Sequence, residues 1–76
     1  MKLRLYQRDD CHLCDAALEV LAQAGAPAFE SVWIDGDPTL EARYGRHVPV
    51  LRDETHGHEL PWPFDAAAVA VFVGRG

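Results

Sequence analysis

Cys11 and Cys14 are the residues of this chain whose types and spacing could do chemistry. They are the only two cysteines among 76 residues, and two residues separate them. A disulfide between them would close a loop too small to constrain the unfolded chain much, so the pair is a poor candidate for a stabilising disulfide. In a cysteine-poor chain, a close pair is more typical of a redox site or a metal site.

A helix over residues 11–24 would place both cysteines in its first turn. The apolar positions that predict this helix recur about every four residues, and they are Leu13, Ala17, Leu18 and Leu21. Residues three apart on a helix are neighbours, so Cys11 and Cys14 can reach the Cα separation of about 4.4–6.8 Å that a disulfide needs. Free N–H groups at a helix start stabilise a thiolate. We therefore expect Cys11 to attack a disulfide and Cys14 to resolve the mixed disulfide.

Charged neighbours of the pair have opposing effects on this chemistry. Negative charge disfavours a thiolate and positive charge favours it. Asp9, Asp10 and Asp15 belong to the first kind, and Arg8 and His12 belong to the second. We expect the two groups to offset each other in part.

Metal binding and a site without catalysis are the other two hypotheses for the pair. Zinc sites usually cluster their ligands in two pairs, and this chain has no second cysteine pair. Four histidines could contribute ligands, and they are His12, His47, His56 and His58. Residues 56–58 have the composition of a hairpin tip, which favours a solvated turn over a ligand set.

The rest of the pattern predicts one α/β domain over residues 1–76. Apolar runs predict strands, and capping residues, prolines and glycines mark the helix ends. The predicted strands cover residues 2–6, 29–35, 48–51 and 58–60, and the predicted helices cover residues 11–24, 38–44 and 66–73. An opening strand–helix–strand unit implies a parallel pair with a right-handed crossover. We therefore expect a four-stranded mixed sheet with helices on both faces.

Both tryptophans are expected to serve packing. Residues 29–35 bring Phe, Val, Trp and Ile together, which favours a strand buried on both faces with Trp33 in the core. Trp62 lies between two prolines, where partial exposure at a substrate surface is the alternative to packing.

Composition narrows the classes of partner. The chain carries 12 acidic and 7 basic residues and a net charge of −5, which argues against a nucleic-acid partner. Charged residues interrupt residues 1–5, and no apolar run is long enough to cross a bilayer, so we expect no membrane association. These features favour a monomer in a reducing cytoplasm.

Two blocks of the chain resemble the glutaredoxins of the thioredoxin-like superfamily. The blocks are residues 6–14, which end in C-H-L-C, and residues 44–50, which end in Val48-Pro49-Val50. The chain is most similar to small bacterial glutaredoxin-like proteins that carry C-H-L-C. This resemblance implies a thioredoxin-like βαβαββα fold and thiol–disulfide oxidoreductase activity. It implies no bound cofactor, with glutathione as a co-substrate, disulfide-containing proteins as partners and an external thiol as reductant.

The resemblance also implies roles for particular residues. Pro49 would be a cis-proline facing the cysteines, and Val48 would pair its backbone with an extended substrate. Arg8 stands where the family has a lysine that contacts a glutathione carboxylate, and a plain surface charge is the alternative. Asp65 would contact a substrate amine or, equally, cap the helix that follows it. Residues 61–65 replace the glycine turn of the family, which is where glutathione would approach the backbone.

His47 stands where family members often have threonine. If Pro49 faces Cys11, the imidazole of His47 could stabilise the thiolate or carry a proton, because histidine titrates near neutral pH. The alternative is a solvent-facing loop histidine. The competing functions for the whole chain are a binding module that keeps the fold without the chemistry and a metal or iron–sulfur carrier.

Overall fold

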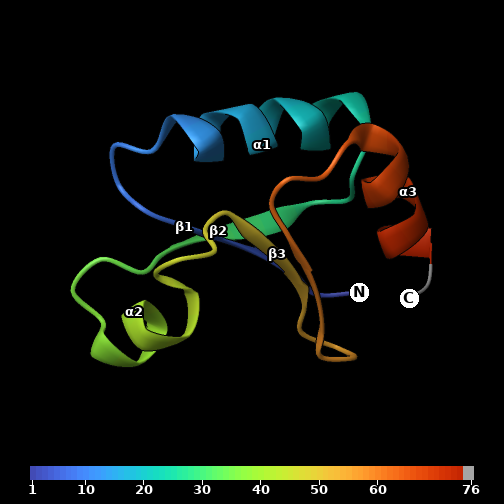
Figure 1. Cartoon of the computed structure of the whole chain (residues 1–76). Coiled ribbons are helices and arrows are strands. Elements are labelled where there is room, and N and C mark those ends of the chain that lie inside the picture. The colour runs from blue at the N-terminus through green and yellow to red at the C-terminus, as the bar shows by residue number, and fades with distance from the viewer. Residues whose placement is uncertain (75–76) are drawn as a thin grey trace.

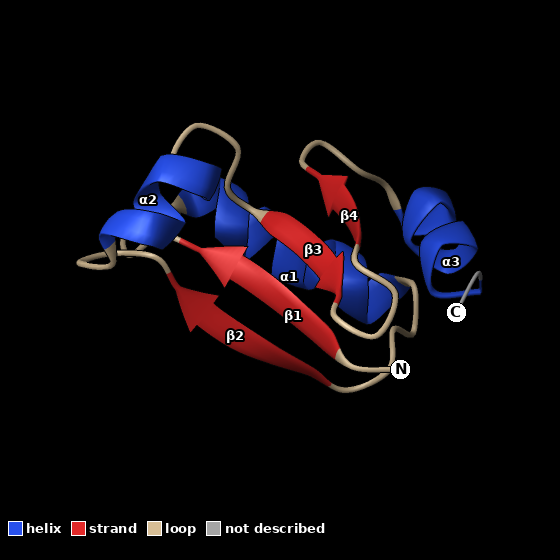
Figure 2. Ribbon diagram, turned by 90° about the horizontal axis from the view of Figure 1, so that it is seen from below, coloured by secondary structure: helices blue, strands red, loops and turns tan. Residues whose placement is uncertain are grey.

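The computed structural model describes residues 1–74 and contains a single four-stranded sheet. The strands are β1 (Leu3–Gln7), β2 (Phe29–Trp33), β3 (Val50–Asp53) and β4 (His58–Pro61), and the helices are α1 (His12–Gln23), α2 (Pro38–Tyr44) and α3 (Ala66–Gly74). The sheet order is β2-β1-β3-β4, with β1 and β2 parallel and the other pairs antiparallel. Helices α1 and α3 cover one face and α2 covers the other (Figures 1 and 2). The expected βαβαββα order and mixed sheet are confirmed.

Side-chain caps explain where each helix begins. The sulfur of Cys11 accepts a hydrogen bond from the Cys14 N–H at 3.2 Å at the start of α1. Asp37 accepts from the N–H groups of the first turn of α2, and Asp65 accepts from the Ala68 N–H at 2.8 Å at the start of α3. Each acceptor satisfies backbone donors that have no partner inside the helix. Gly25, at a φ of +65°, follows the end of α1 because glycine tolerates that conformation at little cost.

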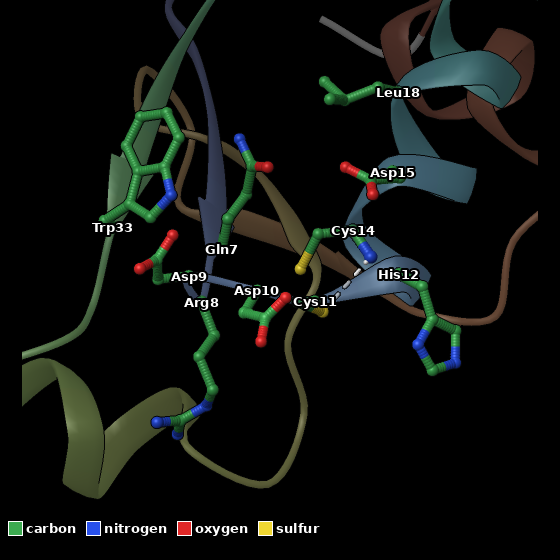
Figure 3. A pocket seen from close by; sticks show the side chains of 10 residues that line it. All are labelled: Gln7, Arg8, Asp9, Asp10, Cys11, His12, Cys14, Asp15, Leu18 and Trp33. Carbon is green, nitrogen blue, oxygen red and sulfur yellow. Dashed lines mark hydrogen bonds between the residues drawn. The ribbon is translucent and has the colours of Figure 1, made fainter.

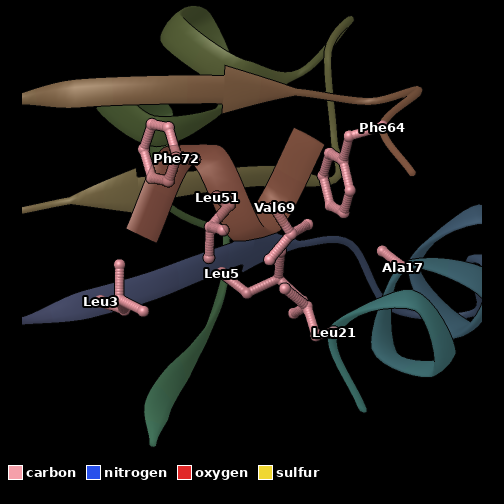
Figure 4. Packing of buried hydrophobic residues seen from close by; sticks show 8 residues of the cluster. All are labelled: Leu3, Leu5, Ala17, Leu21, Leu51, Phe64, Val69 and Phe72. Atoms are coloured by element: carbon pink, nitrogen blue, oxygen red, sulfur yellow. The ribbon is translucent and has the colours of Figure 1, made fainter. Parts of the chain in front are cut away.

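The main core lies between the sheet and the helices α1 and α3 (Figure 4). Its members are Leu3, Leu5, Ala17, Leu21, Leu51, Phe64, Val69 and Phe72. Full burial of one such leucine contributes about 1.5–3 kcal/mol. A smaller core on the α2 face contains Tyr6, Ile34, Tyr44 and Val50. The two tyrosine rings stack there at a centroid distance of 4.4 Å, which fixes α2 against β1.

A row of charged side chains crosses the sheet. Glu30, Arg4, Arg52 and Glu59 are register partners from β2 to β4. Glu54 joins the two arginines, because its carboxylate accepts from Arg4 at 3.1 Å and also contacts Arg52. The shared carboxylate offsets the repulsion between Arg4 and Arg52, which the strand register places opposite each other.

Two expectations about burial are wrong. Strand β2 is an edge strand rather than one buried on both faces, and Trp33 at its end is 54% exposed. On α1, Leu13 and Leu18 are exposed, at 44% and 36%. The buried stripe of α1 is instead Cys14, Ala17 and Leu21. This stripe follows the three- and four-residue steps of a helix face, and the two exposed leucines flank it.

Candidate functional site

A pocket of about 310 Å³ opens beside the first turn of α1 (Figure 3). Its walls come from the end of β1, the loop that follows, the start of α1 and the end of β2. The lining residues are Gln7, Arg8, Asp9, Asp10, Cys11, His12, Cys14, Asp15, Leu18 and Trp33. The two cysteines therefore share a cavity with charged, amide and aromatic groups.

The two cysteines occupy unequal environments. Both are free thiols, with Cys11 partly exposed and Cys14 only 2% exposed. Burial, together with the hydrogen bond to Cys11, raises the pKa of the Cys14 thiol to about 11. The backbone N–H of Cys14 donates to the Cys11 sulfur at 3.2 Å, an arrangement that favours a thiolate on Cys11. Cys11 is thus partly exposed with a sulfur that accepts a backbone hydrogen bond, while Cys14 is buried and its pKa is raised.

The positive charge of Arg8 is already paired with other residues of the chain. Its guanidinium forms ion pairs with Glu41 at 2.7 Å and Asp35 at 3.6 Å, and it donates to the Gly45 carbonyl at 3.2 Å. The side chain extends toward α2 rather than toward the cysteines (Figure 3). These partners occupy the guanidinium that the resemblance assigns to a glutathione carboxylate, and they favour the alternative of a charge paired within the chain.

His12 follows Cys11 on the exposed side of α1. Its imidazole points away from the two sulfur atoms (Figure 3). The adjacent Asp10 has a φ of +54°, a left-handed conformation that aspartate adopts more readily than most residues. This loop geometry brings Cys11 directly from the end of β1 to the start of α1.

The loop before β3 lies outside the lining of the pocket. The Val48–Pro49 bond is cis, as the resemblance implies, and Pro49 is fully buried. The backbone N–H groups of Val48 and His47 both donate to the Tyr44 carbonyl, at 3.1 and 2.8 Å. The N–H of Val48, one part of the backbone predicted to pair with a substrate, is therefore already engaged within the chain, and the His47 side chain is exposed.

Asp65 also lies outside the pocket lining, at the start of α3. It caps this helix, which is one of the two roles considered for it. A second cis bond, Trp62–Pro63, lies in the segment that replaces the glycine turn of the family. Trp62 is partly buried and packs edge-on against Phe64 at a centroid distance of 5.0 Å, which favours the packing role.

Three lining residues were not predicted to belong to the site, namely Gln7, Leu18 and Trp33. Gln7 is 4% exposed, and within the described chain its Nε2 atom has no hydrogen-bond partner. It shares the inward face of β1 with Leu3 and Leu5, because every second residue of a strand points to the same face. A polar residue at an inward strand position was the sequence signal that could have identified it.

Two features of residues 1–74 bear on metal binding and on membrane association. No three His, Cys, Asp or Glu side chains in this part of the chain come together in a way that could hold a metal ion. Among the described helices, none has the length and apolar character needed to cross a membrane.

A dithiol pair at the start of α1 and a cis-proline before β3, in a chain of βαβαββα order, define a glutaredoxin-like protein with the thioredoxin fold. The family model for the glutaredoxin-like domain (DUF836) matches residues 2–73, so the chain belongs to this family. No curated protein is similar enough to count as a match.

Solved structures show the same fold. The X-ray structure of protein XcR50 from X. campestris has a TM-score of 0.92 and 59% identity, covering 97% of each chain. A solution structure of XcR50 has a TM-score of 0.91 at the same identity, covering 100% of this chain and 96% of that one. Protein Ne2328 from Nitrosomonas europaea is 33% identical with a TM-score of 0.71, covering 93% of this chain and 88% of its own.

Proposed function

We propose that this protein is a thiol–disulfide oxidoreductase in which Cys11 attacks and Cys14 resolves. The observation that carries the proposal is the asymmetry of the pair. Cys11 is partly exposed and its sulfur accepts a backbone hydrogen bond, whereas Cys14 is 2% exposed with a pKa raised to about 11. An attacking thiol has to be reachable and anionic, while a resolving thiol can stay protonated until a mixed disulfide forms beside it.

The cycle consists of two exchange steps. The Cys11 thiolate attacks one sulfur of a substrate disulfide, so that a Cys11–substrate bond forms and the other substrate sulfur leaves as a thiolate. Cys14 then loses its proton and attacks the Cys11 sulfur, which releases the second substrate thiolate. The two leaving thiolates take up protons. The substrate gains two electrons, and the protein loses two electrons as it forms the Cys11–Cys14 bridge.

The substrate and reductant are proposed by chemical class. We propose a protein disulfide or a glutathione mixed disulfide as substrate and an external thiol as the reductant that reopens the bridge, with no bound cofactor. One chain carries both cysteines, so a monomer suffices for the cycle. A cytoplasmic setting fits, because the cycle requires a pool of reduced thiols.

The test follows exchange with the neutral 2-hydroxyethyl disulfide and identifies products by mass spectrometry. Wild-type protein should end with an internal Cys11–Cys14 bridge. The Cys14→Ser variant should stop at a mixed disulfide on Cys11, and the Cys11→Ser variant should react far more slowly. A wild-type pair that forms no mixed disulfide, or that cannot cycle at the potential of cellular thiols, would favour the binding module instead. Metal in the purified protein would favour the carrier.

A further inference from the structure

The walls of the cysteine pocket carry negative charge that the described chain does not compensate. Asp9, Asp10 and Asp15 line the pocket and are exposed, and their carboxylates form no hydrogen bond or ion pair with residues 1–74. Arg8 is the arginine among the lining residues, and its guanidinium points toward α2, where it pairs with the carboxylates of Asp35 and Glu41 (Figure 3). A substrate that enters this pocket therefore meets an excess of negative charge.

Trp33, on the opposite wall of the pocket, also favours a positively charged ligand. Trp33 is the register partner of Gln7 on the neighbouring strand, and its indole is 54% exposed. Figure 3 shows the indole across the pocket from Cys14, with the Gln7 side chain between them. The face of an exposed indole attracts ammonium and guanidinium groups. A pocket lined by both an exposed indole and several carboxylates is a suitable environment for a cation.

Gln7 adds an independent sign that the pocket holds a ligand. Its side chain is more than nine-tenths buried and lines the pocket, and within the described chain its Nε2 donor has no partner. A buried donor without a partner is costly, and native proteins rarely keep one without reason. A carbonyl oxygen of a bound peptide would accept from this group. The bound molecule should therefore combine a carbonyl with a positive charge.

We propose that the pocket selects disulfides of basic peptide segments, in which a lysine or arginine stands next to the reacting cysteine. This inference rests on the proposed function and specifies its substrate class. The positive side chain lies between the aspartates and Trp33, a substrate carbonyl accepts from Gln7, and the substrate sulfur reaches Cys11. The exchange itself is unchanged: Cys11 bonds to the substrate sulfur, and the partner sulfur leaves as a thiolate. Oxidised glutathione, which brings carboxylates into the pocket, reacts more slowly.

The charge preference can be measured with three small disulfides that differ in charge. The probes are cystamine, 2-hydroxyethyl disulfide and dithiodipropionate, which are positive, neutral and negative. Each rate constant is divided by that of dithiothreitol with the same disulfide, because leaving-group basicity alters exchange rates. In water, one carboxylate about 7 Å from a unit charge changes its local concentration about threefold. We expect cystamine to exceed dithiodipropionate by more than about tenfold at about 0.01 M salt and this ratio to shrink at about 1 M.

Matched variants assign the preference to the pocket. The Asp9→Asn/Asp15→Asn double variant should lower the ratio of cystamine to dithiodipropionate at least about threefold. Glu19→Gln removes the same type of charge from an exposed site on α1 outside the pocket, so it should leave the ratio unchanged. Because both probes meet the same thiolate, a general change in Cys11 reactivity cancels in this ratio.

The peptide part of the proposal has its own test. Mixed disulfides of the peptides Lys-Cys-Lys and Glu-Cys-Glu, with the same leaving group, compare opposite charges in the presence of carbonyls. Wild-type protein should prefer the lysine peptide. Gln7→Met should slow that peptide several-fold relative to cystamine, which has no carbonyl. Gln7→Leu provides a second variant if the methionine variant folds poorly.

The possible outcomes separate this inference from the proposed function. Normal exchange of the neutral probe through Cys11, with no charge preference, would overturn the inference and leave the oxidoreductase intact. A preference that Asp9→Asn/Asp15→Asn does not change would also overturn it. If the protein prefers cystamine over dithiodipropionate but Gln7→Met slows cystamine and the lysine peptide equally, the proposed contact with a peptide carbonyl is wrong. Failure of all probes to react would overturn both proposals.

Discussion

The two thiols should react with alkylating agents at very different rates. Burial and the hydrogen bond to Cys11 raise the pKa of Cys14 from the ordinary 9.0 to about 11. Below both values, the thiolate fraction falls tenfold for each pH unit by which the pKa rises. Near neutral pH, Cys14 should therefore hold about 100-fold less reactive thiolate than an ordinary cysteine. Its 2% exposure slows the approach of a reagent further.

The assay is alkylation by iodoacetamide from about pH 7 to about pH 11, with an unstructured cysteine peptide as reference. The Cys14→Ser variant reports on Cys11, and the Cys11→Ser variant reports on Cys14. Peptide mapping of wild-type protein tests Cys14 with its neighbour present. We expect the alkylation rate of Cys14 to keep rising above pH 9, where the rate of the reference peptide levels off. In Cys11→Ser, Cys14 should differ less from the reference peptide, because the hydrogen bond to Cys11, one cause of its raised pKa, is gone.

Urea-unfolded protein provides the control, because both cysteines should then match the reference peptide. The reasoning would be refuted if Cys14 in the folded protein reacted as fast as the reference near neutral pH. A Cys14 profile that levels off near pH 9 would contradict it equally. Either result would mean that burial does not protect the resolving thiol.

Three further predictions concern stability in urea. The free energy of unfolding should fall as pH rises from 9 to 11, because the unfolded chain loses the Cys14 proton that the folded chain keeps. Cys14→Ala should remove up to about 2.7 kcal/mol of this fall. If Cys14→Ala leaves the pH dependence of stability unchanged, the raised pKa of Cys14 is contradicted. Burial opposes ionisation of Glu54, but hydrogen bonds from Tyr6 and Arg52 outweigh it and lower the pKa of this carboxyl. Stability should therefore be lost as pH falls below the ordinary value of 4.5, since the unfolded chain binds the proton first, and Glu54→Gln should make this acid loss shallower. Gln7→Met should raise the free energy of unfolding by about 1 kcal/mol, because it removes a buried donor without a partner, and a loss of stability would show that the amide is satisfied.

The sequence by itself determined the features that depend on neighbours along the chain. The apolar spacing from Leu13 to Leu21 predicted α1, and with it a dithiol at the start of this helix. Capping residues a few positions away marked the starts of α2 and α3. The number, order and type of elements also followed, because each is encoded in a short periodic segment. Gln7 was missed because the predicted strand ended one residue too early.

Only the tertiary structure decided which groups face the cysteines. Strand β2 pairs with β1 alone, which leaves it at the edge, exposes Trp33 and sets it beside Gln7. Arg8 finds its ion-pair partners, Asp35 and Glu41, 27 and 33 residues further along the chain. The register of the sheet and the packing of α2 bring these groups together. Local sequence patterns do not record such pairings, so the charge and the aromatic wall of the pocket emerge only when the sheet is assembled.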